Sequence, residues 1–232
     1  MAIVVSRKEL KYAISEVEYS KYVDLLSKLL KPDKSNGEVG YNVRSLYFDS
    51  AFNDDYYAKM DGLETRKKIR LRIYRTTDTE VKLEIKRKVG VNQTKSTIMI
   101  KKEDAIELIK MNYEVLLKYD EETAKRAYNI MILGQYRPKV LVEYKRKAYI
   151  HRENKIRITL DCDIRASEFD FDLFNENVYL MPTFDTYDAV LEVKFNGELF
   201  KWISDMIRGN DCVYESISKY SNSRKFFDNY LA

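Results

Sequence analysis

Residues 155–164 read Lys155-Ile-Arg-Ile-Thr-Leu-Asp-Cys-Asp-Ile164. Apolar and polar side chains alternate along this stretch, which is the two-residue period of a β-strand with one face on a core. The period predicts an apolar face of Ile156, Ile158, Leu160, Cys162 and Ile164, and an opposite face of Lys155, Arg157, Thr159, Asp161 and Asp163. The second face is almost entirely charged.

The same alternation recurs along the chain. It predicts eight strands, at Arg7–Ile14, Val43–Asp49, Lys67–Tyr74, Val81–Lys88, Thr94–Ile100, Lys139–Lys147, Lys155–Ile164 and Ala189–Phe195. Helical spacing is present in Glu18–Leu30, Lys102–Leu117, Glu121–Leu133, Leu199–Ile207 and Ser223–Leu231. Pro32–Tyr41 and Phe169–Asp188 are expected to be loops. No repeat or shift in composition marks a boundary, so we expect one domain over residues 1–232.

The polar faces of these strands hold arginine and lysine in excess. Arg70 and Arg72 share one face of their strand, as do Lys82 and Lys86 of the next. A sheet with its charged face in water is the usual reading of such a pattern. However, like charges repel across neighbouring strands, and the amphipathic helices need an apolar surface to cover. We therefore expect an α+β fold with a barrel that is apolar outside and cationic inside, which suits a linear polyanion.

Composition excludes several classes of protein. The chain has 232 residues and a net charge of only +4. It lacks a glycine-rich phosphate loop. His151 is its one histidine, and Cys162 and Cys212 stand apart, so histidine-based nucleophilic catalysis and a zinc site are poorly supported. No stretch approaches the ~20 apolar residues of a membrane span, and no signal peptide is recognisable, so a soluble cytoplasmic protein is expected.

A tightly held phosphate chain implies a divalent cation on an acidic residue. The candidates on inward faces are Glu9, Glu84, Asp161, Asp163 and Glu192.

Short motifs in a fixed order extend over nearly the whole chain. They are Arg7-Lys-Glu-Leu-Lys-Tyr12, Ser45-Leu-Tyr-Phe-Asp49, Tyr57-Ala-Lys-Met-Asp-Gly62, Lys68-Ile-Arg-Leu-Arg-Ile-Tyr74, Leu83-Glu-Ile-Lys86, Lys95-Ser96, Tyr144-Lys-Arg146, Arg157-Ile-Thr-Leu-Asp161, Val190-Leu-Glu-Val-Lys194 and Ser218-Lys-Tyr220. Each is weak alone. The ordered set resembles the polyphosphate-polymerase domain of the vacuolar transporter chaperone (VTC) family, which belongs to the triphosphate tunnel metalloenzymes of the CYTH-like superfamily.

The resemblance implies a closed antiparallel eight-stranded β-tunnel with helices packed outside. It implies an ATP:polyphosphate phosphotransferase that moves the γ-phosphate of ATP onto a growing phosphate chain. By carry-over, Arg70, Arg72, Lys86 and Arg157 would be catalytic, and Lys11, Lys95, Tyr144, Arg146, Lys194, Ser218 and Lys219 would bind substrate. Glu192 would hold the Mn or Mg ion. Packing or pairing roles stay open for Tyr144, Lys219 and Glu192.

Two positions depart from related sequences. The related phosphatases and cyclases open with a Glu-x-Glu-x-Lys motif, whose first position here is Arg7. That difference favours the polymerase branch. Ser216 stands where the family often has a basic residue, which puts one phosphate contact in doubt.

Two rival functions stay open. A triphosphatase of the same fold, acting on inorganic or nucleoside triphosphate, needs only water in place of the acceptor phosphate. A nucleic-acid or polyanion-binding module would use the basic strands and the 19 tyrosines, although we expect no nucleic acid as partner. ATP and polyphosphate are the expected partners, and a membrane-protein partner is possible.

Overall fold

The computed structural model describes residues 7–90, 92–151, 156–183, 187–208, 213–214 and 217–224. All eight predicted strands are present. They are β1 (Arg7–Ile14), β3 (Tyr41–Asp49), β4 (Thr65–Ile73), β5 (Glu80–Val89), β6 (Asn92–Lys101), β7 (Arg137–Ile150), β8 (Arg157–Ser167) and β10 (Ala189–Asn196). Three two-residue strands join them, β2 (Lys31–Pro32), β9 (Met181–Pro182) and β11 (Val213–Tyr214). Lys155, Cys212 and Ser216 lie outside the described residues.

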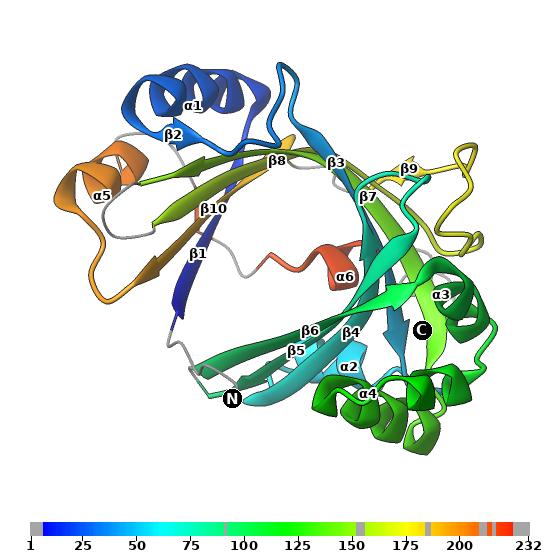
Figure 1. Cartoon of the computed structure of the whole chain (residues 1–232). Helices are drawn as coiled ribbons and strands as arrows, with labels where there is room; N and C mark the ends of the chain where they lie inside the picture. Colours follow the sequence, from blue (N-terminus) through cyan, green and yellow to red (C-terminus); the bar gives the residue numbers. More distant parts are fainter. Residues whose placement is uncertain are drawn as a thin grey trace.

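The strands form one antiparallel sheet in the order β11-β1-β10-β8-β7-β3-β4-β5-β6, with β2 paired to β7 and β9 to β8. Figure 1 shows this sheet curving round, so that it has a concave and a convex face. We call the concave side the inner face. No backbone pairing among the described residues joins β6 to β1 or β11. On the side away from β10, β1 pairs with β11 at Tyr12 and Ala13. The prediction of closure into an eight-stranded tunnel is therefore not confirmed.

Apolar residues of the strands form an outward surface that helices cover, as predicted, while Val43, Val140, Val142 and Val190 belong to a separate cluster on the inner face. The helices are α1 (Glu16–Leu29), α2 (Asp54–Met60), α3 (Lys102–Ile109), the 3-10 helix η1 (Tyr113–Lys118), α4 (Glu122–Leu133), α5 (Lys201–Arg208) and α6 (Lys219–Asn222). One core packs α3, η1 and α4 on β3–β6, and a second packs α1 and α5 on β8 and β10. These helices lie on the convex side in Figure 1. None of the helices in the described ranges is long and apolar enough to span a membrane.

Helix α6 corrects the expectation that all helices pack outside. It lies on the concave side of the sheet in Figure 1, and its Tyr220 packs with Tyr47 and Tyr144 of the inner face. The predicted helix at residues 223–231 is wrong at its start, since α6 ends at Asn222 and Ser223 is its C-cap. Residues 225–231 lie outside the described part of the chain. Helix α2 was not predicted.

A bulge in β8 corrects the predicted faces of that strand. Asp163 has a φ of 51°, and the pairing of β7 with β8 shifts register beside it. The bulge interrupts the alternation, so Ile164 joins the inner apolar cluster with Val43 and Val142 instead of the outer core. The Asp163 carboxylate pairs with Arg165 at 2.6 Å, and the side chain is 36% exposed. Asp163 is thus removed from the inward metal candidates.

Helix α2 is fixed by two buried carboxylates. Asp49 accepts hydrogen bonds from the backbone N–H groups of Asp55 and Tyr56 at the helix start. The Asp55 carboxylate is 2% exposed, receives a hydrogen bond from the Tyr136 hydroxyl at 2.9 Å and pairs with Lys67 at 3.0 Å. Burial, and then the nearby Asp49 carboxylate, raise the pKa of Asp55 to about 6.

Substituting Asp55→Asn is expected to stabilise the protein at pH 8. Asp55 binds its proton more tightly when folded, so the free energy of unfolding falls as pH rises from about 4 to about 6 and stays lower above that range. The neutral amide removes this cost, for a gain of about 3 kcal/mol at pH 8 that vanishes near pH 4. Urea unfolding at several pH values measures it, with the exposed Asp61→Asn as control. A gain that is the same at every pH would contradict this assignment.

Candidate functional site

Cations on β4 and β5 face each other across the two strands. The inner-face register pairs Arg66 with Lys88, Lys68 with Lys86, Arg70 with Glu84 and Arg72 with Lys82, and Lys86 is also opposite Lys95 of β6. We call these nine residues the cation ladder. Like charges directly opposite one another are destabilising in a sheet unless an anion lies between them. Three of the four β4–β5 rungs oppose cation to cation, so the ladder is suited to an extended anion.

Glu84 is the acidic member of the ladder. It is 2% exposed and holds Arg70 at 2.7 Å, Lys95 at 2.5 Å and Arg72 at 3.7 Å. Burial alone would raise the pKa of Glu84, but Arg70, Arg72 and Lys95 hold it well below its usual range. With three cations around it, Glu84 organises the ladder.

Two residues of β3 complete this wall. The Tyr47 hydroxyl accepts a hydrogen bond from Arg70 at 2.8 Å, and the Ser45 hydroxyl accepts one from Arg72 at 3.2 Å. Burial raises the pKa of the Tyr47 phenol, but Arg70 and Arg72 outweigh it and lower that pKa overall. Sequence reasoning missed both residues as part of the site, although they alternate with outward apolar residues in Ser45-Leu-Tyr-Phe48.

Lys68 was also missed. It is two residues before Arg70, so the strand period places it on the same face. Its ammonium donates to the Ser218 hydroxyl at 2.6 Å. Burial, together with the nearby cations Lys11 and Lys86, lowers the pKa of Lys68 well below its ordinary value. An anion beside these three lysines would relieve that repulsion.

The opposite wall of the inner face comes from β7, β8 and α6. Asp161 is fully buried, accepts two hydrogen bonds from Arg146 at 2.6 and 2.7 Å and pairs with Lys219 at 2.6 Å. Burial raises the pKa of Asp161, but Arg146 and Lys219 lower it to about 2. Both cations also lie over the Tyr144 ring, at 5.2 and 4.7 Å. The Tyr144 ring thus lies against two predicted phosphate ligands, and direct binding of substrate by Tyr144 stays a prediction.

Helix α6 reaches into the inner face from the end of the described chain. Ser218 meets Lys68, and the carbonyl oxygen of Ile217 accepts a hydrogen bond from Lys11 at 3.1 Å. The helix is tied down by Tyr220, whose hydroxyl donates to Asp49 and receives a hydrogen bond from Arg224 at 2.9 Å. The structure therefore brings the segment with the predicted residues Ser218 and Lys219 together with Lys11 of β1, Lys68 of β4 and Asp161 of β8.

The candidate metal centre consists of Glu9 on β1 and Glu192 on β10. Glu192 is 5% exposed and pairs with Lys194 at 2.5 Å and Arg146 at 3.8 Å. Glu9 pairs with Lys11 at 3.0 Å, Lys86 at 3.1 Å and Lys194 at 3.9 Å. Burial and the Glu192 charge raise the pKa of Glu9, but these three lysines outweigh them and lower that pKa overall. The described ranges contain no group of three or more His, Cys, Asp or Glu side chains that could hold a metal.

This donor set fits one kind of metal binding. Mg²⁺, and Mn²⁺ like it, is commonly held by one or two carboxylates together with the phosphates of a substrate. Glu9 and Glu192 supply two carboxylates, each balanced by lysine. They fit an ion that is shared with bound phosphate, and they do not form a complete protein cage.

Arg157 and Tyr74 mark one end of the inner face. Arg157 donates to the Tyr41 hydroxyl at 3.2 Å and pairs with Asp33 at 3.1 Å. The Tyr41 ring lies 5.9 Å from that of Tyr74, two residues beyond Arg72. Arg157 thus lies at the same end of the inner face as Arg72 and Lys82. Its side chain is 35% exposed.

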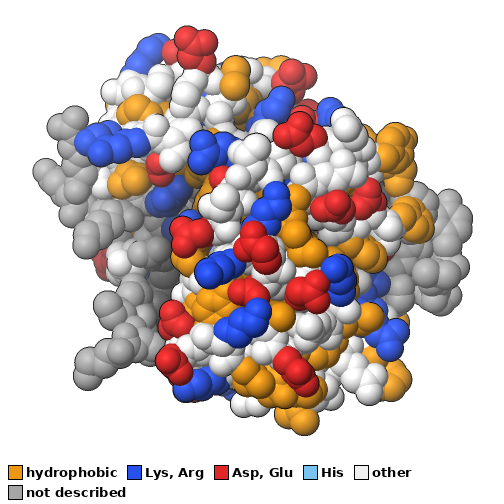
Figure 2. All heavy atoms as spheres, turned by 45° about the vertical axis from the view of Figure 1, so that its right-hand side comes forward, with side chains coloured by type: hydrophobic (Ala, Val, Ile, Leu, Met, Phe, Trp, Pro, Cys, Tyr) orange, Lys and Arg blue, Asp and Glu red, His pale blue; other side chains and the backbone are white. Residues whose placement is uncertain are grey.

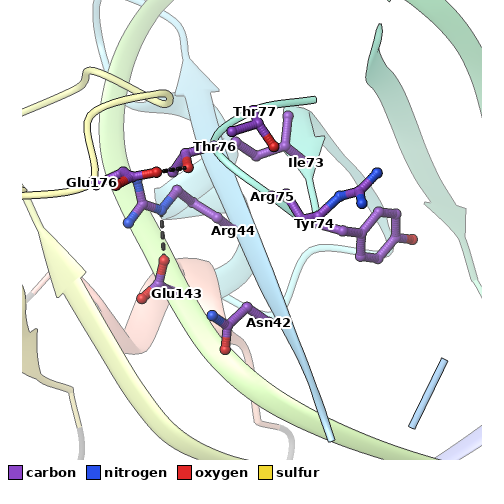
Figure 3. A pocket seen from close by; sticks show the side chains of 9 residues that line it. All are labelled: Asn42, Arg44, Ile73, Tyr74, Arg75, Thr76, Thr77, Glu143 and Glu176. Atoms are coloured by element: carbon purple, nitrogen blue, oxygen red, sulfur yellow. Dashed lines mark hydrogen bonds and ion pairs between the residues drawn. The ribbon is translucent and has the colours of Figure 1, made fainter. Parts of the chain in front are cut away.

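A cavity of about 440 Å³ adjoins this end on the outer side of β3 and β7 (Figure 3). Arg44 pairs with Glu143 at 2.6 Å and donates to the carbonyl oxygens of Leu173 and Asn175. Thr76 donates to Glu176 at 2.7 Å. These contacts fasten the loop over residues 169–180 to the sheet. Figure 3 shows the Tyr74 ring turned away from Arg44 and Glu143.

The outer surface has a different charge pattern. Figure 2 shows Lys and Arg side chains interspersed with Asp and Glu over the face that carries α3 and α4. No large area of one sign is visible on that face. The concentration of like charge described above belongs to the inner face.

Comparisons with known proteins agree with this fold. A family model described as the VTC domain matches residues 6–227. Among solved structures, the chain is similar to a candidate adenylate cyclase from Bacillus halodurans, with 10% identity, a TM-score of 0.57, and coverage of 98% of this chain and 97% of that one. It is also similar to a candidate adenylyl cyclase from Hippeastrum, described as having a dominant triphosphatase activity, with 14% identity, a TM-score of 0.57 and 94% of each chain covered. No curated protein matches the chain.

Proposed function

This chain belongs to the VTC-domain family, within the triphosphate tunnel superfamily, and from that membership we propose that it transfers the γ-phosphate of ATP to a growing polyphosphate chain. The observation that carries the proposal is the cation ladder of β4 and β5. Its rungs face the inner side of the sheet, where an extended phosphate chain would neutralise them.

The length of the ladder favours a chain longer than a triphosphate. Successive rungs are two residues apart, so they lie about 7 Å from one another and four rungs extend about 20 Å. Neighbouring phosphorus atoms in a phosphoanhydride chain lie much closer together than two rungs. Three phosphates would therefore cover one or two of the four rungs and leave the cations of the other rungs without an anion.

The residues of the inner face would act by positioning and by neutralising charge. Arg70 and Arg72, held by Glu84, would contact the transferred phosphoryl group, and Lys86 and Arg157 would neutralise flanking phosphates. Glu192, with Glu9, would hold a Mn or Mg ion, which stabilises charge on phosphate oxygens when it is bound. Lys11, Lys68, Lys95, Arg146, Lys194, Ser218 and Lys219 would hold the rest of the chain.

No strong general base is needed for this reaction. A terminal phosphate oxygen of the acceptor, already anionic near neutral pH, attacks the γ-phosphorus. The bond from that phosphorus to the bridging oxygen breaks, and its electron pair stays on the β-phosphate of ADP. The histidine of this chain, His151, lies against Phe200 with ring centroids 5.0 Å apart, where β7 ends. It is not placed among the phosphate ligands.

Hydrolysis is the second candidate function. The description of the Hippeastrum relative as a triphosphatase favours it, because water in place of the acceptor phosphate would use the same cations. Nucleic-acid binding is less favoured. The cations oppose one another across strands of the concave inner face and do not form the single exposed platform on which the bases of a nucleic acid stack. Short polyphosphate should therefore displace any bound nucleic acid far better than the reverse.

The test is to incubate the pure protein with ATP and Mn²⁺ and to separate the products on a gel that resolves polymeric phosphate. Polymer together with ADP is the expected result. Release of orthophosphate without polymer would assign hydrolysis in its place. An absence of both products, with folded protein and several divalent metals tried, would overturn the proposed phosphoryl transfer.

A further inference from the structure

A second cavity, of about 330 Å³, lies at the Arg72 end of the cation ladder. It is lined by Arg72 and Lys82, by Tyr74 and Met99, and by residues of the turn between β4 and β5. Its volume is in the range of small-molecule sites, roughly 300–1,000 Å³. We propose that this cavity is a nucleoside subsite, in which Tyr74 and Met99 hold the base of the nucleotide whose phosphates lie on Arg72 and Lys82. This inference rests on the proposed function.

Apolar surface beside the cations is the first reason. Tyr74 is 36% exposed and Met99 42% exposed, although both adjoin the charged end of the inner face. Met99 is opposite Lys82 in the β5–β6 register, and the Lys82 ammonium lies 4.7 Å from the centre of the Tyr74 ring. An inorganic phosphate chain gains nothing from such surface. An aromatic base does, because it stacks on aromatic rings and packs against thioethers.

The turn that carries Tyr74 is held in place from within. The Asp78 carboxylate accepts hydrogen bonds from the backbone N–H groups of Tyr74 and Arg75, at 2.9 and 3.1 Å, and from the Arg75 guanidinium at 3.1 Å. These hydrogen bonds fix the backbone position from which the Tyr74 side chain extends. The rim also offers the Thr77 hydroxyl and the Glu80 carboxylate, which are suitable partners for the hydroxyl groups of a sugar.

The neighbouring cavity of Figure 3 is a weaker candidate, although the two share Tyr74, Arg75 and Thr77. Its main polar groups already bind each other, since Arg44 is engaged by Glu143 and two loop carbonyl oxygens. The Tyr74 ring also points away from those groups in Figure 3. The Tyr74 ring is therefore assigned to the second cavity, which adjoins the cation ladder.

Calorimetric titration with two ligands tests the subsite. A non-hydrolysable ATP analogue and inorganic tripolyphosphate, each with Mg²⁺, are titrated into the wild type and into the double variant Tyr74→Ala/Met99→Ala. The Kd of the ATP analogue should rise at least about tenfold from lost stacking. The Kd of tripolyphosphate should stay within about twofold. Tyr74→Phe keeps the ring and should retain affinity for the analogue, and Met111→Ala, at a similarly exposed methionine elsewhere, is the control.

Each outcome bears on a distinct claim. If the double variant weakens both ligands equally, or neither, the nucleoside subsite is overturned while the phosphate site stands. If the wild-type protein binds neither ligand, the proposed function is wrong and the nucleoside subsite is wrong with it. The ratio of the two Kd values thus separates the two failures.

Discussion

Replacing Lys86 or Arg72 by methionine is expected to reduce ATP turnover by at least about 100-fold while the protein stays folded. Removal of one preorganised group that stabilises developing negative charge commonly costs 10²–10³ in kcat, or about 3–4 kcal/mol. Arg72 adjoins the organising carboxylate of Glu84, and Lys86 is opposite both Lys68 and Lys95. Each side chain would therefore contact phosphate directly.

The thermal stability of Lys86→Met and Arg72→Met should rise or stay the same. Loss of Lys86 leaves Glu9 paired with Lys11 at 3.0 Å, and loss of Arg72 leaves Glu84 paired with Arg70 and Lys95. No carboxylate is orphaned, and repulsion between cations decreases. Thermal melts with and without tripolyphosphate measure this. Arg87→Met, on the other face of the same strand, is the matched control and should retain full activity.

A variant that melts far below the wild type yet keeps full turnover would show that its residue is structural. That result for both Lys86→Met and Arg72→Met would remove the cation ladder from the site.

Glu192→Gln is expected to abolish metal-dependent turnover while the protein still binds polyphosphate. The substitution removes a buried carboxylate from the Glu9–Glu192 pair and leaves the cations of the inner face in place. Amides are weaker ligands than carboxylates for hard divalent cations. Lys194 and Arg146, which now pair with Glu192, would remain available to phosphate.

Calorimetric titration of Mn²⁺ in the presence of a non-hydrolysable ATP analogue measures the metal affinity directly. We expect it to fall at least about tenfold in Glu192→Gln, and also in Glu9→Gln if the two carboxylates share the ion. Glu198→Gln, an exposed carboxylate just beyond β10, is the control. Unchanged affinity in Glu192→Gln would eliminate Glu192 as a ligand and pass the role to Glu9, Glu84 or Asp161.

The two-residue period of the strands predicts part of the candidate site. The two-residue period correctly placed Arg70, Arg72 and Lys86 on one face, and the same period would have added Lys68 and Tyr47. It did not predict that Glu84 organises three cations, because their convergence depends on the packing of β4, β5 and β6. It also did not predict the cavity beside Tyr74, which the turn between two strands creates.

Local sequence pattern was enough to predict the eight long strands, their outward apolar faces and the charged residues of their inner faces. Side-chain alternation and helical spacing are local properties that neighbouring residues enforce. The order of the strands, the edge of β6 that no described residue pairs with, the bulge that turns Ile164 inward and the position of α6 on the concave side could not be predicted from that pattern. Each of these depends on contacts between residues far apart in the chain, such as Tyr220 with Asp49, whose energies no local period encodes.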